Sequence, residues 1–386
     1  MKLRTFCNLL AAVIFSAIAV PLLTFSRAQW SDPIEKRVSA QMPPAPHRLG
    51  DLAAFLKQFE AYFGDHLGQR TALIDLRQYI DVSLFQRSPT DLVLIGKQDW
   101  LFFTGDHAID DYRGRQRLSA EQLDSWYRTL KQRHDALAAQ GIAYRFVFAP
   151  NKHSIYPEFM PDSVTRGAST QFDQLLAYVK QKGDLDVLDD LRPELIAHKS
   201  AGPLYGVLDV HWNRYGAYFG YRTFMQDLLA RNHVAGAHLL ELRPQDFQKV
   251  PTRFGDMAQM MHFNPYLRDT LTFQYAGPPL ACPHIQATVP PRAVGAKGTP
   301  DRDEMTIDCL EPGRSARLMM FHDSMSEAMF DYITNSFGHV RFTWTYPDSH
   351  DIACYVAAEK PDVVIEERSE RGVIAVPNAS VPFACN

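Results

Sequence analysis

Arg317-Leu318-Met319-Met320-Phe321-His322-Asp323-Ser324 decides the fold of this chain, together with Asp209-Val210-His211-Trp212 earlier in the sequence. The apolar start of the first stretch predicts a strand, and the helix-like residues 326–333 follow it. Ser324 then lies at a strand-to-helix turn on the carboxyl edge of a sheet. There a hydroxyl projects into the cleft, and the N–H groups of the next helix can receive an oxyanion. We therefore expect Ser324 to be a nucleophile.

The stretch from Asp209 to Trp212 supplies a base and its orienting carboxylate. In an extended Asp-x-His segment both side chains lie on the same side of the backbone, because side-chain direction alternates with period two. The carboxylate of Asp209 can then steer the imidazole of His211 and stabilise its protonated form. The residues alone leave an alternative open, in which this segment is a packed strand and Ser324 only caps a helix.

Strands and helices alternate along most of the chain, which predicts an α/β fold with a mostly parallel sheet and helices on both faces. A single catalytic domain is expected over residues 49–386, with a helical segment at about 49–88 and an irregular insertion at about 240–313. The predicted strands are 91–95, 100–103, 143–149, 186–189, 317–321, 339–344 and 362–366. The predicted helices are 119–140, 171–182, 214–230 and 352–358, besides the one after Ser324.

The first residues indicate export. Lys2 and Arg4 precede an apolar stretch from Phe6 to Phe25, in the order of a signal peptide. That stretch is also long enough to span a bilayer, so residues 1–28 are expected to be an uncleaved anchor or a cleaved signal, with the anchor preferred. Residues 29–48, which are rich in proline and polar groups, read as a tether.

The cysteines agree with an exported protein. Cys282, Cys309, Cys354 and Cys385 are an even number outside the apolar segment, and no Cys-x-x-Cys spacing indicates zinc. We expect disulfides between neighbours, Cys282 with Cys309 and Cys354 with Cys385, which is one of three possible connectivities. Buried free thiols are the alternative.

Several segments together resemble a known family. Residues 94–103, Ala149–Lys152 and Asp209–Gly216 are similar, in this order, to the alginate O-acetyltransferase AlgJ/AlgX family of SGNH-hydrolase-like polysaccharide O-acetyltransferases. The resemblance runs from about residue 34 onward and is closer to AlgJ, because no carbohydrate-binding module follows. It implies a permuted SGNH-like sheet, with the Asp and His before the serine. His322-Asp323-Ser324 departs from the Gly-Asp-Ser or Arg-Asp-Ser expected of the family.

The resemblance implies a periplasmic O-acetyltransferase, tethered at the inner membrane. Ser324 would take acetyl as an acetyl-serine, and a polysaccharide hydroxyl deprotonated by His211 would accept it. The acetyl group would come from a membrane-bound O-acyltransferase, and other exopolysaccharide secretion proteins would be partners. Alginate is the expected polymer, and weak binding of it in isolation is expected. An SGNH-type acetyl esterase and a non-catalytic scaffold of the secretion complex are the alternatives.

Other residues near these motifs have less certain roles. Asn151 either donates to the oxyanion or is a turn residue, and Lys152, at the family's Pro-x-Lys position, either binds an anionic substrate or holds the loop through an ion pair. Arg368 is expected to contact substrate or to pair with Glu367 across the cleft. His322 and Asp323 are expected to be structural rather than a metal ligand and an orienting acid. No metal and no cofactor are expected, and a net charge of −4 argues against nucleic acid.

Overall fold

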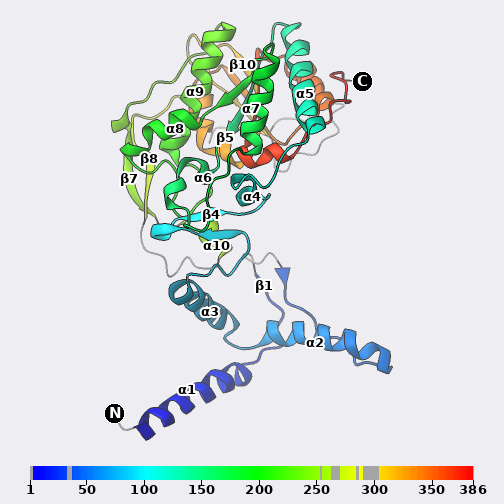
Figure 1. The fold of residues 1–386 in the computed structure, drawn as a ribbon, viewed down its shortest axis with the longest axis vertical. Helices are drawn as coiled ribbons and strands as arrows, with labels where there is room; N and C mark the ends of the chain where they lie inside the picture. The colour runs from blue at the N-terminus through cyan, green and yellow to red at the C-terminus, as the bar shows by residue number, and fades with distance from the viewer. Residues whose placement is uncertain are drawn as a thin grey trace. The chain divides into compact units, whose positions relative to one another are not determined.

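The computed structural model describes residues 3–32, 37–252, 254–261, 270–283, 287–289 and 304–385 (Figure 1). The chain divides into two compact units, one ending at Pro89 and the other beginning at Thr90 and holding nearly all of the rest. Residues 49–88, expected in the catalytic domain, therefore belong to the other unit.

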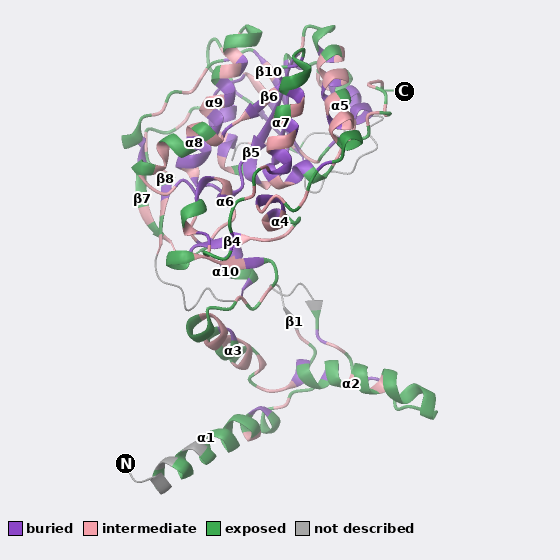
Figure 2. Cartoon of the chain, in the orientation of Figure 1, coloured by how far each residue is buried: buried purple, intermediate pink, exposed green. Residues whose placement is uncertain are grey.

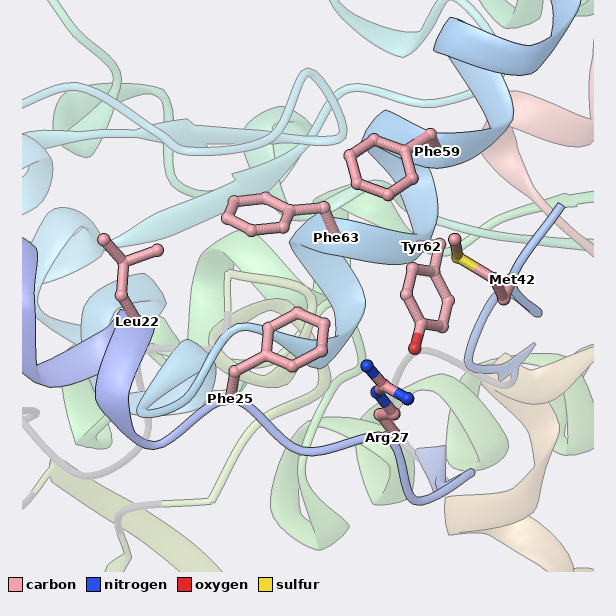
Figure 3. A pocket seen from close by; sticks show the side chains of 7 residues that line it. All are labelled: Leu22, Phe25, Arg27, Met42, Phe59, Tyr62 and Phe63. Atoms are coloured by element: carbon pink, nitrogen blue, oxygen red, sulfur yellow. The ribbon is translucent and has the colours of Figure 1, made fainter. Parts of the chain in front are cut away.

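The first unit consists mainly of helices. α1 (Leu3–Leu23), α2 (Leu52–His66) and α3 (Arg70–Phe85) accompany a small antiparallel pair, β1 (Ser31–Asp32) and β2 (Arg37–Val38). An apolar pocket of about 430 Å³ lies beside α2, where the ring of Phe25 meets those of Tyr62 and Phe63 at centroid distances of 6.0 and 5.7 Å (Figure 3). Nowhere in the described residues is a helix both long and apolar enough to cross a membrane.

The second unit is built on a six-stranded sheet in the order β6-β5-β12-β10-β11-β9. Every neighbouring pair is parallel except β11 with β9, so the sheet is mostly parallel, as the sequence predicts. The bounds in this order are β6 (Leu188–Asp190), β5 (Ala143–Ala149), β12 (Val363–Ser369), β10 (Arg317–His322), β11 (His339–Trp344) and β9 (Met305–Asp308).

Helices cover both faces of this sheet. Along β5, Phe146 and Phe148 join one hydrophobic cluster with α5 (Ala120–Ala138), α7 (Gln171–Lys182) and α12 (Ser349–Glu359). Val147 and Ala149 join the other, with α8 (Arg192–His198), α9 (Arg214–Asn232) and α11 (Phe330–Thr334). The alternation follows from the period of two in a strand. Figure 2 shows the buried residues concentrated in this sheet, so the predicted three-layer α/β architecture is confirmed.

Local signals in the sequence set several of the element boundaries. Ser119 caps α5 through the backbone N–H of Gln122, whose side chain reaches back to Ser119 in a capping box. The strands predicted at 91–95 and 100–103 appear as the antiparallel pair β3 (Val93–Ile95) and β4 (Leu101–Phe103). The short helices α4 (Ala108–Tyr112) and α6 (Lys152–Ile155) follow β4 and β5.

The insertion expected at about 240–313 contains antiparallel strands. β7 (Phe247–Thr252) pairs with β8 (Thr270–Tyr275), α10 (Asp256–Met260) follows β7, and β9 joins the main sheet as its edge. Cys282 bonds to Cys309 and Cys354 bonds to Cys385, so the predicted connectivity is confirmed. Residues 253, 262–269, 284–286 and 290–303 of the expected insertion lie outside the described residues.

Candidate active site

The candidate residues gather at one edge of the sheet. β5, β12 and β10 are neighbours, and the sequence continues from β5 into Asn151 and Lys152 and from β10 into Asp323 and Ser324. β12 runs alongside to Ser369, which pairs with Ala149. Because ligands bind outside the carboxyl ends of parallel strands, this edge is the candidate active site.

The turn after β10 leaves Ser324 free. Asp323, not Ser324, caps the following helix, because its carboxylate accepts the backbone N–H of Met325 at 2.8 Å. That helix, η8 (Ser324–Met329), is a 3₁₀ helix and continues into α11, where a single α-helix is the sequence prediction. The hydroxyl of Ser324 is partly exposed and makes no hydrogen bond with the described residues. The interpretation of Ser324 as a mere helix cap is therefore wrong.

Two buried carboxyl groups fix this turn. Asp323 also accepts from the Tyr346 hydroxyl at 2.6 Å and the Ser369 N–H at 2.8 Å, and these donors hold its pKa below the usual range despite burial. Glu367 accepts from the Asp323 N–H at 3.2 Å and the Ser326 hydroxyl at 2.7 Å. Burial and the charge of Asp323 raise the pKa of Glu367 well above normal.

The base and its carboxylate are joined, but not in an extended strand. Asp209 Oδ1 accepts both the backbone N–H of His211 at 2.9 Å and the ring Nδ1 of His211 at 2.8 Å. The first bond makes the segment a turn of the Asx type, which the bridge between Tyr205 and Trp212 closes. The prediction of an extended Asp-x-His is wrong in its backbone, although the turn brings the same two side chains together.

The charges in this turn reinforce the base. Burial acts to lower the pKa of His211, but the hydrogen bond and charge of Asp209 outweigh it and raise the pKa. Burial likewise acts to raise the pKa of Asp209, and His211 brings it down to about 2. His211 Nε2 is buried and has no hydrogen-bond partner among the described residues, so His211 and Ser324 are not bonded to each other. The Asp–His half of a triad is formed, and the contact with the hydroxyl is open.

The turn that holds His211 is nevertheless tied to the turn that holds Ser324. The indole Nε1 of Trp212 donates to the carbonyl of Met325 at 2.7 Å. Arg214 Nη1 donates to the carbonyl of Ala328 at 3.2 Å. The residues next to the base and next to the serine thus share hydrogen bonds, which keeps the two groups on the same side of the sheet edge.

Lys152 supports the site rather than facing a substrate. Its Nζ donates to the carbonyls of Gly206, Val207 and Asp209 at 2.7, 2.8 and 3.0 Å, and it lies 5.0 Å from the ring centroid of Trp100. Burial lowers the pKa of Lys152 to about 7. The expected roles in anion binding and in an ion pair are therefore replaced by hydrogen bonds that hold the Asp209 turn.

Asn151 remains a candidate for the oxyanion. Its backbone N–H donates to Glu370 at 2.8 Å, which fixes the residue, whereas its side-chain Nδ2 is buried and has no hydrogen-bond partner. A buried amide donor left unpaired is costly unless a ligand accepts from it. Asn151 thus keeps a free donor at the carboxyl end of β5.

Arg368 lies on the wrong face for the predicted role. It is buried with its guanidinium 5.2 and 4.4 Å from the rings of Trp126 and Tyr346 and 3.7 Å from Glu366. β12 continues through Ser369, so Glu367 and Arg368 are adjacent strand residues on opposite faces. The predicted pairing of Glu367 with Arg368 across a cleft is therefore wrong, and Arg368 belongs to the packing between sheet and helices. His322 is buried against the ring of Phe330.

The structure adds two charged residues that the sequence did not single out. Asp256, in α10, lies with its Oδ2 3.7 Å from His211 Nδ1, and with Asp209 and His211 it forms a group of possible metal ligands. Arg371 follows β12, pairs with Asp106 at 3.3 Å and lowers the pKa of His211 by its charge. Asp256 falls in the irregular insertion, where no pattern marks it.

The comparisons with known proteins match part of the chain to one family. Residues 93–278 match the model of the family described as SGNH hydrolase-like domain, acetyltransferase AlgX. This match covers just under half of the chain. The matched residues include Asn151, Lys152, Asp209, His211 and Asp256 of the site, and they end before Ser324. The predicted family is confirmed, and so is the predicted SGNH-like fold. No curated protein sequence matches the chain.

Three solved structures are similar at low identity. Bacillus cereus PatB1 with a sulfonyl adduct is 15% identical, covers 74% of this chain and 96% of its own, and has a TM-score of 0.48. The O-acetyltransferase domain of Pseudomonas putida AlgJ is 16% identical, with coverages of 73% and 91% and a TM-score of 0.45. Pseudomonas aeruginosa AlgX is 15% identical, with coverages of 74% and 65% and a TM-score of 0.44.

Proposed function

We propose that this chain is an exported polysaccharide O-acetyltransferase of the AlgX acetyltransferase family that works through an acetyl-serine. The observation that carries the proposal is the Asp209–His211 hydrogen bond of 2.8 Å, on a turn where the indole of Trp212 donates to the carbonyl of Met325, the residue after Ser324. A base with an oriented imidazole and a hydroxyl without competing bonds are the two parts that nucleophilic acyl transfer requires.

In the first half of the reaction the enzyme is acetylated on Ser324. His211 Nε2 takes the proton of Ser324 as Oγ attacks the acetyl carbonyl of the donor, and Asp209 stabilises the imidazolium that forms. The negative charge on the carbonyl oxygen is received by the backbone N–H of Ser324 and by Asn151 Nδ2. The leaving group of the donor takes the proton from His211 as the tetrahedral intermediate collapses to the acetyl-serine.

The second half transfers the acetyl group to the glycan. A sugar hydroxyl gives its proton to His211 as its oxygen attacks the acetyl-serine, and Ser324 takes the proton back when it leaves. The expected acceptor is alginate. The expected donor relay is a membrane-bound O-acyltransferase, because acetyl-CoA is absent outside the cytoplasm. Other exopolysaccharide secretion proteins are the proposed partners.

Two disulfides and the family point to a protein outside the cytoplasm, because disulfides persist in oxidising compartments. The finer proposal is a periplasmic enzyme held at the inner membrane by its first residues. It rests on the order of charged and apolar residues at the start of the sequence.

The test measures transfer rather than hydrolysis. The purified protein is incubated with a chromogenic acetyl ester, with and without short uronate oligosaccharides, beside Ser324→Ala and Ser326→Ala. Ser326 is the matched control, because its hydroxyl is fully buried and bonded to Glu367. We expect acetyl on the oligosaccharide with the wild type and Ser326→Ala, and none with Ser324→Ala. Ester cleavage without transfer would support an acetyl esterase, and turnover that survives in Ser324→Ala would refute the acetyl-serine.

A further inference from the structure

The insertion places a second carboxyl group, that of Asp256, next to the base His211. Asp256 Oδ1 accepts the backbone N–H of Val210 at 2.8 Å, and the backbone N–H of Asp256 donates to Asp209 Oδ2 at 3.3 Å. Each turn therefore gives a backbone N–H to the carboxylate of the other. Val210 stands between the orienter and the base, so the contact reaches the centre of the Asp209–His211 turn.

The contact is also electrostatic. Asp256 Oδ2 lies 3.7 Å from His211 Nδ1, beyond hydrogen-bond distance but close enough for its charge to act on the imidazole. Burial and the nearby charge of Asp209 raise the pKa of Asp256 to about 6. When Asp256 ionises it favours the imidazolium, so its charge acts on the base in the same direction as that of Asp209.

We propose that Asp256 is a positioning residue for the base of this enzyme: it fixes the Asp209–His211 turn and adds a second carboxylate that stabilises the imidazolium of His211. The inference rests on the proposed function, in which His211 is the general base. It makes the insertion part of the active site, since α10 carries the residue.

Other charged groups act on the same turn. The ammonium of Lys152 holds the carbonyl of Asp209 at 3.0 Å, and the guanidinium of Arg371 lowers the pKa of His211. Both cations oppose the two carboxylates. Removing the charge of Asp256 shifts that balance, so the pKa of His211 is expected to fall.

Two substitutions separate the hydrogen bond from the charge. Asp256→Asn keeps an oxygen that accepts the Val210 N–H and loses the charge, whereas Asp256→Ala loses both. We expect Asp256→Asn to lower the pKa of His211, because a nearby opposite charge favours the protonated imidazole. Asp256→Ala is expected to show the same shift and a kcat reduced by about tenfold or more, because a loosened base is misplaced.

The experiment measures His211 directly. The pKa of His211 is followed by NMR titration, with its signal assigned from His211→Gln, and kcat for transfer is measured in parallel. Asp246→Asn is the matched control, because Asp246 lies in the same insertion, pairs with Arg243 and is not among the charges that act on His211. The control should leave the pKa of His211 unchanged.

The outcomes of the two proposals are distinguishable. A pKa of His211 that is the same in wild type, Asp256→Asn and Asp256→Ala would overturn the electrostatic part, and an unchanged kcat in Asp256→Ala would overturn the positioning part. Because the NMR titration needs no turnover, it tests Asp256 even if the wild type transfers no acetyl. Absence of transfer in the wild type would count against the proposed function alone.

Discussion

Neighbouring residues in the serine turn should respond in opposite ways to replacement by alanine. Asp323 accepts hydrogen bonds from Met325, Tyr346 and Ser369, while the hydroxyl of Ser324 makes none with the described residues. Asp323→Ala leaves three donors unpaired, and each costs about 1 to 3 kcal/mol when buried. Tyr346 is 40% exposed and its hydroxyl can turn to water, so we expect a loss of roughly 3 to 5 kcal/mol in the free energy of unfolding.

Ser324→Ala removes a hydroxyl without a partner and should change the free energy of unfolding by less than about 0.5 kcal/mol. The assay is urea unfolding followed by tryptophan fluorescence, since four of the five tryptophans, Trp100, Trp126, Trp212 and Trp344, lie in the second unit. A Ser324→Ala variant as unstable as Asp323→Ala, or an Asp323→Ala variant as stable as the wild type, would refute the assignment of the cap to Asp323.

The stability difference between the wild type and Asp323→Ala should depend on pH in a definite direction. The pKa of Asp323 is depressed in the folded protein, so its stabilising contribution is present above the ordinary aspartate pKa and is lost as the pH falls through the folded value. The difference in stability between the wild type and Asp323→Ala should therefore shrink in acid. A difference that grows as the pH falls would contradict the ionised state of Asp323.

Three further outcomes are expected. Lys152→Met should lower kcat without raising the KM for an oligosaccharide acceptor, because Lys152 holds the Asp209 turn and does not face substrate. A raised KM with a normal kcat in steady-state kinetics would instead support a role of Lys152 in substrate binding. Asp209→Asn should lower kcat and move the acid limb of the pH profile of kcat/KM to lower pH, because Asp209 raises the pKa of His211 while burial acts to lower it. An acid limb at the same pH or at higher pH would contradict this. Replacing Cys354 and Cys385 with serine together should lower the free energy of unfolding by about 3 to 4 kcal/mol from loop entropy, and equal stability in urea would refute a structural bond.

Periodicity predicted much of the sheet. Residues 143–149 and 339–344 are rich in apolar, aromatic and β-branched residues, interrupted by Arg145 and Arg341, and they form β5 and β11 with the predicted bounds. α7 likewise has the predicted bounds, because Thr170 caps its start and Gly183, at φ +78°, ends it. Local signals of this kind depend on a few adjacent residues, so the sequence contains them in full.

The predictions that were wrong concern residues whose contacts are distant in sequence. β12 runs past Glu366 because Ser369 bonds to Asp323 and pairs with Ala149, and this extra length sends Arg368 to the opposite face. Lys152 finds its three carbonyls more than fifty residues away, where no spacing rule applies. The pairing of base and orienter was predicted for another reason: the two side chains are only two residues apart, and both an extended strand and an Asx turn bring them together.

The central claim is that Ser324 carries the acetyl group, and the most direct measurement is the mass of the enzyme after brief exposure to an acetyl ester. The protein is quenched in acid, digested and examined by peptide mass spectrometry, with His211→Gln run alongside. The account predicts one acetyl group on the peptide that contains Ser324, located on that serine, and far less in the His211 variant. An acetyl group on another residue, or equal labelling without the imidazole of His211, would contradict it.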